Sequence, residues 1–158
     1  MEGDPQNGWH EIGAVVAFLT VNWLSILIAA IVSWLFGALY YGALAKLWVQ
    51  AQGKTMEQFR AEQAAKVGQF TAQLPFILSF VADLVMAWAL YGILTHMNLF
   101  TLRAGIISGA LIWFGFVLTT ISVNYAFSGR RPMLTLIDAG HWLGVLVIIG
   151  AIVGWFGR

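Results

Sequence analysis

The stretch that decides the fold is GRRPMLTLIDAGHWLG, residues 129–144, and it continues as a mainly apolar segment to Phe156. A basic turn leads into Pro132. A carboxylate, Asp138, and an imidazole, His141, then lie inside a segment long enough to cross a bilayer, for which about 20 apolar residues suffice. A charged side chain in hydrocarbon costs roughly 2.5–3.5 kcal/mol on insertion scales. The rest of the chain must therefore supply partners for these two groups.

The composition is that of an integral membrane protein. Of the 158 residues, 60% are hydrophobic and 9% are charged, whereas a soluble domain has about 25% charged residues. The formal net charge is +1, and no clustered basic face indicates nucleic-acid binding. The chain has no cysteine, which excludes disulfides, thiolate metal sites and cysteine nucleophiles.

Four apolar segments follow one another along the chain. Each has about 24 residues, or about 36 Å of helix, enough to cross a bilayer with some tilt. Backbone groups in hydrocarbon must be satisfied within a segment, so an all-α fold is expected. Pro75 and Pro132 lie near two helix starts, where a missing N–H costs nothing. The predicted four-span membrane domain, residues 22–158, has spans at 22–45, 74–97, 102–127 and 133–156.

Two shorter helices are expected outside the spans. Thr55 and Gln58 have the spacing of a capping box, and apolar residues recur through 56–70. This pattern predicts an amphipathic helix on the membrane surface in the first loop, with a solvated linker as the alternative. Residues 1–21 form a predicted N-terminal extension that is partly interfacial. Within it, residues 9–20 lie along the interface or extend the first span.

The distribution of Lys and Arg predicts the orientation. The first and third loops hold six of the eight basic residues. The positive-inside rule places these loops in the cytoplasm and both termini outside. The predicted cytoplasmic anchors are Lys46, Arg130 and Arg131.

The polar residues of the spans are predicted to meet at matching depths. Counted from the cytoplasmic helix ends, Asp83 and His141 lie level, at about 13 and 12 Å. Asp138 shares a helical face with His141 and lies at about 7 Å, as do the two tyrosines of the first span, while Asn124 lies at about 4 Å. We expect one intramembrane cluster of Asp83, Asn124, Asp138 and His141, capped by Tyr41 or Tyr40.

Two interpretations of this cluster remain open. Buried polar groups hold helices together in many membrane bundles. Intramembrane ionisable residues also mark proton relays and ligand pockets. A metal site is not expected, because His10 and His96 fall on the other side from His141, and no cofactor is expected either.

Small residues spaced four apart predict close helix packing. Such pairs let two backbones approach. On the fourth span, Gly140 and Gly144 lie nearly opposite Asp138, so this helix either is central in the bundle or has one side against another protein. The predicted packing residues are Gly37, Gly42, Gly105, Gly109, Gly140, Gly144, Gly150 and Gly154.

No catalytic motif is found: the chain has no phosphate loop, no GxSxG elbow and no HExxH. We therefore expect no catalytic residue, and a non-catalytic accessory or assembly subunit of a membrane complex or homo-oligomer. The alternative is a small proton-linked transporter or carrier that uses the polar cluster. An enzyme acting on a lipid or quinone ranks third.

Several short stretches together resemble one family. They include GALYYG (37–42), WFGF (113–116), NYAF (124–127) and IDAGHWL (137–143). These resemble the bacterial membrane family called domain of unknown function 1761, from about Asn22 to Trp155. The resemblance implies a small four-span protein of the bacterial cytoplasmic (inner) membrane and supplies no activity. The family pattern more often has Tyr where His141 stands.

Overall fold

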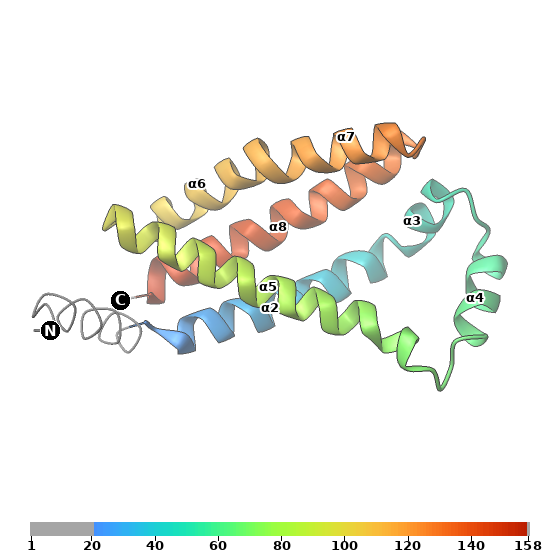
Figure 1. Ribbon diagram of the computed structural model, residues 1–158, viewed down its shortest axis with the longest axis horizontal. Coiled ribbons are helices and arrows are strands. Elements are labelled where there is room, and N and C mark those ends of the chain that lie inside the picture. Colours follow the sequence, from blue (N-terminus) through green and yellow to red (C-terminus); the bar gives the residue numbers. More distant parts are fainter. Residues whose placement is uncertain (1–20, 158) are drawn as a thin grey trace, which may run out of the picture.

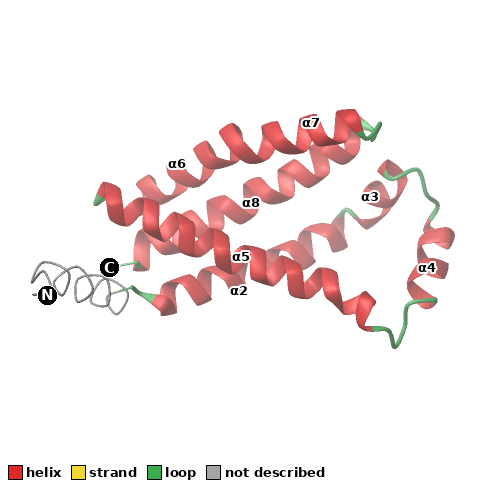
Figure 2. Ribbon diagram, in the orientation of Figure 1, coloured by secondary structure: helices red, strands yellow, loops and turns green. Residues whose placement is uncertain are grey.

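The computed structural model describes residues 21–157, and in this part of the chain it consists of helices joined by short loops (Figure 1). The predicted interfacial segment at 9–20 and Arg158 lie outside the described residues. No strand occurs within residues 21–157 (Figure 2). The helices are α2 (Trp23–Ala43), α3 (Ala45–Ala51), α4 (Met56–Ala64), α5 (Phe70–Met97), α6 (Leu102–Ile112), the π-helical η1 (Trp113–Leu118), α7 (Thr119–Phe127) and α8 (Pro132–Phe156).

Four of these helical segments are long and apolar enough to cross a membrane: α2, α5, the continuous α6–η1–α7 segment over Leu102–Phe127, and α8. The all-helical fold with four long apolar helices is therefore confirmed. The third segment has the predicted limits, and the first and fourth differ from them by no more than two residues. Pro132 occupies the first turn of α8, where its missing N–H leaves no hydrogen bond unmade.

The start of the second span was predicted wrongly. α5 begins at Phe70 rather than at residue 74, and Pro75 lies inside the helix instead of at its first position. α5 begins directly after a left-handed turn: Gly68 has a φ of +81°, a conformation that glycine adopts readily, and Gln69 is the N-cap of α5. The loop helix stops at Ala64, with Ala65 as its C-cap, so residues 65–70 are not part of it.

The predicted capping box of α4 is confirmed. The Thr55 hydroxyl accepts from the Gln58 backbone N–H at 3.2 Å, and the Gln58 side chain accepts from the Thr55 N–H at 2.9 Å. The helix packs back on the bundle through Phe59, whose ring meets Trp48 edge-on at 6.0 Å. Val67 lies beyond the end of α4 and is 80% exposed, so it is not part of a continuous apolar face of this helix.

α8 is the central helix of the described bundle. It packs against α2, α5 and α6 along its length and against α3 and α7 near its start. Its residues Val145, Ile149 and Val153 are fully buried and form the main apolar core with side chains of α2 and α5. The sequence left open whether this helix is central in the bundle or has one side against another protein. The structure has it in the central position.

Glycines bring α6 and α8 into backbone contact. A methyl group at Gly105 would overlap the carbonyl of Gly150, and one at Gly109 would overlap the carbonyl of Leu146. Likewise, Gly154 faces the carbonyl of Thr101. Only glycine permits this approach, because any Cβ would meet main-chain atoms that cannot move aside.

Candidate functional site

The polar centre of the bundle is the carboxylate of Asp138, which is 8% exposed. Its Oδ1 accepts from the Tyr41 hydroxyl at 2.9 Å and from the Trp48 indole N–H at 3.1 Å, and its Oδ2 accepts from the Tyr125 hydroxyl at 2.7 Å. We call these four residues the Asp138 clasp. The carboxyl group of Asp138 thus receives three hydrogen bonds from donors of the same chain.

The clasp joins four helices. Tyr41 comes from α2, Trp48 from α3 and Tyr125 from α7, while Asp138 lies on α8. The break at Leu44, where φ is −99° and ψ is 10°, separates α2 from α3. The rings of Tyr41 and Trp48 then meet edge-on, with centroids 5.5 Å apart. The carboxylate therefore fixes the angle between α2 and α3 as well as their contact with α8.

His141 lies one helical turn from Asp138 inside an aromatic box. Its ring centroid is 4.8 Å from that of Tyr41, 5.7 Å from that of Tyr40 and 5.0 Å from that of Trp142. Phe36 stacks on it at 6.2 Å with an interplanar angle of 9°. The imidazole is 7% exposed, and its Nδ1 has no hydrogen-bond partner among the described residues.

Two glycines give the box its shape. A Cβ at Gly37 would lie 2.8 Å from Nε2 of His141, and a Cβ at Gly140 would lie 2.8 Å from the Tyr40 hydroxyl. The Tyr40 hydroxyl donates to the carbonyl of Ile137 at 3.0 Å. Both Cβ distances are shorter than real Cβ contacts, so these glycines allow the imidazole and the phenol to approach the facing helix. Gly144 similarly faces the ring of Phe36.

The family described as "Protein of unknown function (DUF1761)" matches residues 24–154. The chain belongs to this family. The resemblance expected from the short stretches is thereby confirmed, and the matched range contains the whole Asp138 clasp and the aromatic box. No curated protein and no solved structure matches the chain.

In this DUF1761 chain, Asp83 is not level with His141, contrary to prediction. Trp34 of α2 donates to the Ser79 hydroxyl of α5 at 3.2 Å, while Gly37 lies against His141. Gly37 follows Trp34 by three residues, which is about 4.5 Å along α2 at about 1.5 Å per residue. Asp83 follows Ser79 by four residues, which is about 6 Å along α5, and because α5 runs opposite to α2 this step goes toward the other end of the bundle. Asp83 is therefore displaced from His141 by about 10 Å along the bundle.

The displacement has a physical cause. The depth prediction counted Asp83 from a helix start at residue 74, but α5 begins at Phe70, which moves Asp83 about 6 Å deeper. Asp83 is nonetheless buried, with 3% of its surface exposed, and its Oδ1 has no hydrogen-bond partner in the described structure. It makes no hydrogen bond with the clasp.

Asn124 was also expected in the cluster, and the structure does not bring it there. Its side chain is exposed, and the hydroxyl that reaches Asp138 belongs to the next residue, Tyr125. Successive residues of a helix point about 100° apart, so Tyr125 and Asn124 cannot both face α8. Trp48 was missed as well, because it lies beyond the predicted end of the first span at residue 45. The side chains of Trp48 and Tyr125 both carry hydrogen-bond donors, and Tyr125 lies near the predicted depth of Asp138.

The remaining predicted residues lie at the ends and edges of the bundle. Lys46 and Arg130 are exposed. Nη1 of Arg131 donates to the Gln50 carbonyl at 2.8 Å, which ties the loop before α8 to α3. Gly42 is exposed, and a Cβ added there would meet no atom within 4 Å. No group of three or more His, Asp or Glu side chains suited to a metal occurs within residues 21–157.

Proposed function

We propose that this chain is a multi-pass protein of the bacterial cytoplasmic membrane that acts as a non-catalytic assembly or accessory subunit, in a homo-oligomer or a larger membrane complex. The observation that carries the proposal is the set of hydrogen bonds that Asp138 accepts within its own chain. Both of its oxygens accept hydrogen bonds from the chain's own donors. A carboxylate used in this way fastens helices, whereas a catalytic acid or base must reach a substrate.

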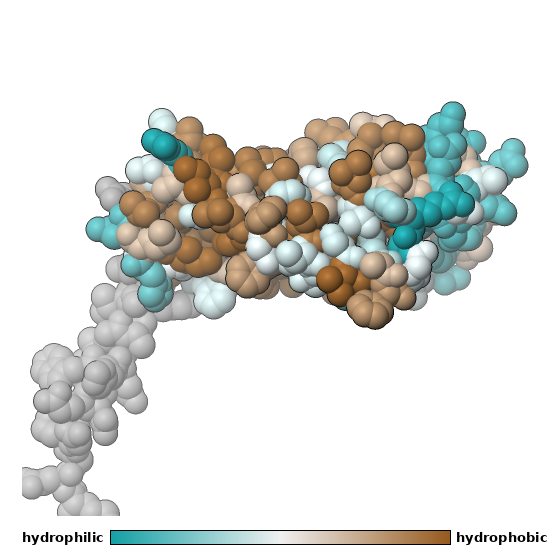
Figure 3. Space-filling view, turned by 90° about the horizontal axis from the view of Figure 1, so that it is seen from above, coloured by the Kyte–Doolittle hydropathy of each residue, from teal (hydrophilic) through white to brown (hydrophobic). Residues whose placement is uncertain are grey.

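The membrane location is supported by the distribution of polarity. Hydrophilic side chains gather at the end that holds α3 and α4, and apolar side chains cover much of the face beside it (Figure 3). That end holds six of the eight basic residues of the sequence. The positive-inside rule favours a cytoplasmic α3–α4 end with both termini outside.

An unused helix face supports assembly. Ala38 and Gly42 are exposed on α2, four residues apart, and Leu39 beside them is 74% exposed. In contrast to the glycines of α6 and α8, Gly42 meets no other helix of its own chain. Small residues at this spacing allow a second helix to approach closely, so we assign this face to a neighbouring chain.

Cysteine crosslinking tests the assembly role, because the natural sequence has no cysteine. In bacterial membranes, Gly42→Cys is expected to form a disulfide-linked species on mild oxidation. The matched control Ala89→Cys, at an exposed site on α5, is expected to stay monomeric. Gly42→Leu should convert the native-mass-spectrometry signal to monomer. A wild-type monomer in mild detergent, together with no crosslink at residue 42, would refute the assembly role.

A second candidate, a small proton-linked carrier, is favoured by one observation. Ser33 Oγ, Asp83 Oδ1 and His141 Nδ1 are buried without a hydrogen-bond partner among residues 21–157. Buried polar atoms are usually paired with protein or ordered water, so these three fit a hydrated path. Its test is proton flux into liposomes with a trapped pH-sensitive dye. Flux that Asp83→Asn abolishes and Glu57→Gln preserves would replace the assembly role with the carrier.

A further inference from the structure

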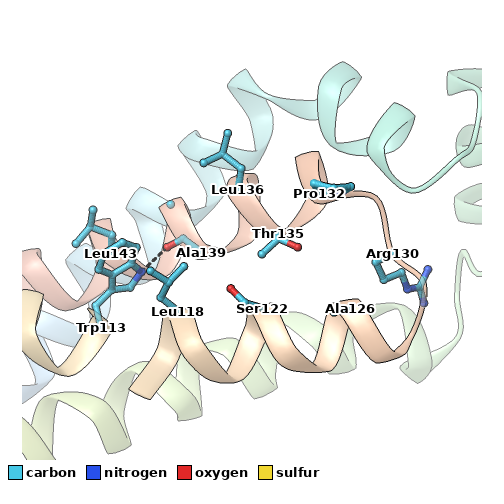
Figure 4. A pocket seen from close by; sticks show the side chains of 11 residues that line it. Trp113, Leu118, Ser122, Ala126, Arg130, Pro132, Thr135, Leu136, Ala139 and Leu143 are labelled. Carbon is cyan, nitrogen blue, oxygen red and sulfur yellow. Dashed lines mark hydrogen bonds between the residues drawn. The ribbon is translucent and has the colours of Figure 1, made fainter. Parts of the chain in front are cut away.

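A groove runs between the third and fourth long helices, and none of the four residues of the Asp138 clasp lines it. Its volume is about 630 Å³. Leu118, Ser122 and Ala126 line one wall, and Thr135 and Leu143 line the other (Figure 4). The lining is apolar except for two hydroxyls and the Arg130 guanidinium at one end.

The groove exists because the small residues of α6 give way to a large one. Gly105, Gly109 and Trp113 recur every four residues and so lie on the same helical face. The two glycines touch the α8 backbone, whereas Trp113 inserts its ring and donates to the Ala139 carbonyl at 2.7 Å. The π-helical η1 begins at Trp113. The indole thus closes one end of the groove and holds α7 away from α8.

The length of the groove matches one leaflet of a bilayer. Pro132 to Leu143 covers about 17 Å of helix at about 1.5 Å per residue, close to one leaflet of a hydrocarbon core about 30 Å thick. The groove is open along its side and is lined almost entirely by apolar side chains, which suits an extended acyl chain lying along it.

The open end of the groove is positively charged. Arg130 is exposed and has no ion-pair partner among the described residues. The same end carries Glu57 and Glu62 as its acidic side chains, and Glu62 already pairs with Lys54. Basic pockets between membrane helices attract anionic lipid head groups. The charge therefore complements a phosphate.

We propose that the groove binds one acyl chain of an anionic phospholipid, with its phosphate against Arg130. The proposal rests on the proposed membrane insertion and is independent of the assembly role. The alkyl chain replaces bulk lipid along Leu118 and Leu143, and the guanidinium is a planar multi-donor partner for phosphate. The indole of Trp113 limits how deep the chain reaches.

Native mass spectrometry of the full chain in mild detergent tests this inference. Phosphatidylglycerol should bind about fivefold more tightly than phosphatidylcholine with the same acyl chains, since one basic residue near a lipid surface contributes about 1 kcal/mol. Arg130→Gln should remove that preference. The matched variant Arg60→Gln, at an exposed site on α4 of the same end, should keep it.

The groove itself is tested by filling it. Ala126→Phe should lower the affinity for both lipids, whereas Ala89→Phe, on the exposed side of α5, should change neither. Phosphatidylglycerol with a photoreactive acyl chain should label peptides that contain Leu118 or Leu143. Equal binding of both lipids, equal effects of the two arginine variants, or unchanged binding by Ala126→Phe would overturn the inference. Recovery of the chain outside the membrane fraction would instead refute insertion.

Discussion

Replacing Asp138 by alanine tests the most connected contact of the bundle. The substitution removes the acceptor of three partly buried hydrogen bonds, from Tyr41, Trp48 and Tyr125. In membrane helices such bonds contribute on average about 0.6 kcal/mol each, with a maximum near 1.7. Three of them predict a loss of about 2–5 kcal/mol in the free energy of unfolding.

The assay is reversible unfolding in mixed micelles of dodecyl maltoside and SDS, followed by far-ultraviolet circular dichroism. Asn124→Ala is the matched control: it has similar predicted depth and an exposed side chain, so it should change stability by less than about 0.5 kcal/mol. Tyr125→Phe removes a single hydroxyl and should cost about 0.6–1.7 kcal/mol.

A double-mutant cycle separates the clasp from general burial. Tyr125→Phe should be nearly neutral in the Asp138→Ala background, because its partner is already absent. The reasoning is refuted if Asp138→Ala is no more destabilising than Asn124→Ala. It is equally refuted if the effects of Tyr125→Phe and Asp138→Ala add without coupling.

Two further predictions concern packing and capping. Gly105→Leu should destabilise the bundle by about 1–3 kcal/mol or more in the same micelle titration, because its Cβ would overlap the Gly150 carbonyl. Gly92→Leu should be tolerated, since a Cβ at Gly92 meets no atom within 4 Å, and equal effects of the two variants would contradict the backbone contact. Thr55→Ala removes the capping box of α4 and should cost that helix about 1 kcal/mol. Hydrogen exchange should then be faster in α4 alone, and unchanged α4 exchange would contradict the cap.

The sequence predicted those features that depend on the local chain. Span limits follow from the lengths of apolar runs, and the α4 cap follows from Thr55 and Gln58, whose side chains reach neighbouring backbone groups. The depth of Asp138 along its helix could also be predicted, since α8 begins at Pro132, one residue before the predicted start. The same calculation failed for Asp83, because the left-handed turn at Gly68 allows α5 to begin earlier.

The rotation of each helix about its own axis could not be predicted from the sequence. Asn124 and Tyr125 have nearly the same depth, and which of them faces α8 depends on how α7 is turned. The π-helical segment η1 adds to this rotation, because it inserts extra residues per turn before α7 begins. The contact of Trp48 with Asp138 could not be predicted for a related reason. The break at Leu44 redirects the chain, and no local sequence pattern gives the new direction of α3.

The two ends of α8 are held by different kinds of contact, and this difference explains where the groove lies. Near Gly150, α8 touches α6 through main-chain atoms, so the two axes must be close. Near Asp138, long side chains from α2, α3 and α7 converge on the carboxylate, and such contacts operate at larger axial distances. A straight α8 cannot be equally close to its neighbours at both ends. The space between α7 and α8 opens beside Asp138, along residues 132–143, and Trp113, at the change from glycine to bulky residues, is placed where it begins.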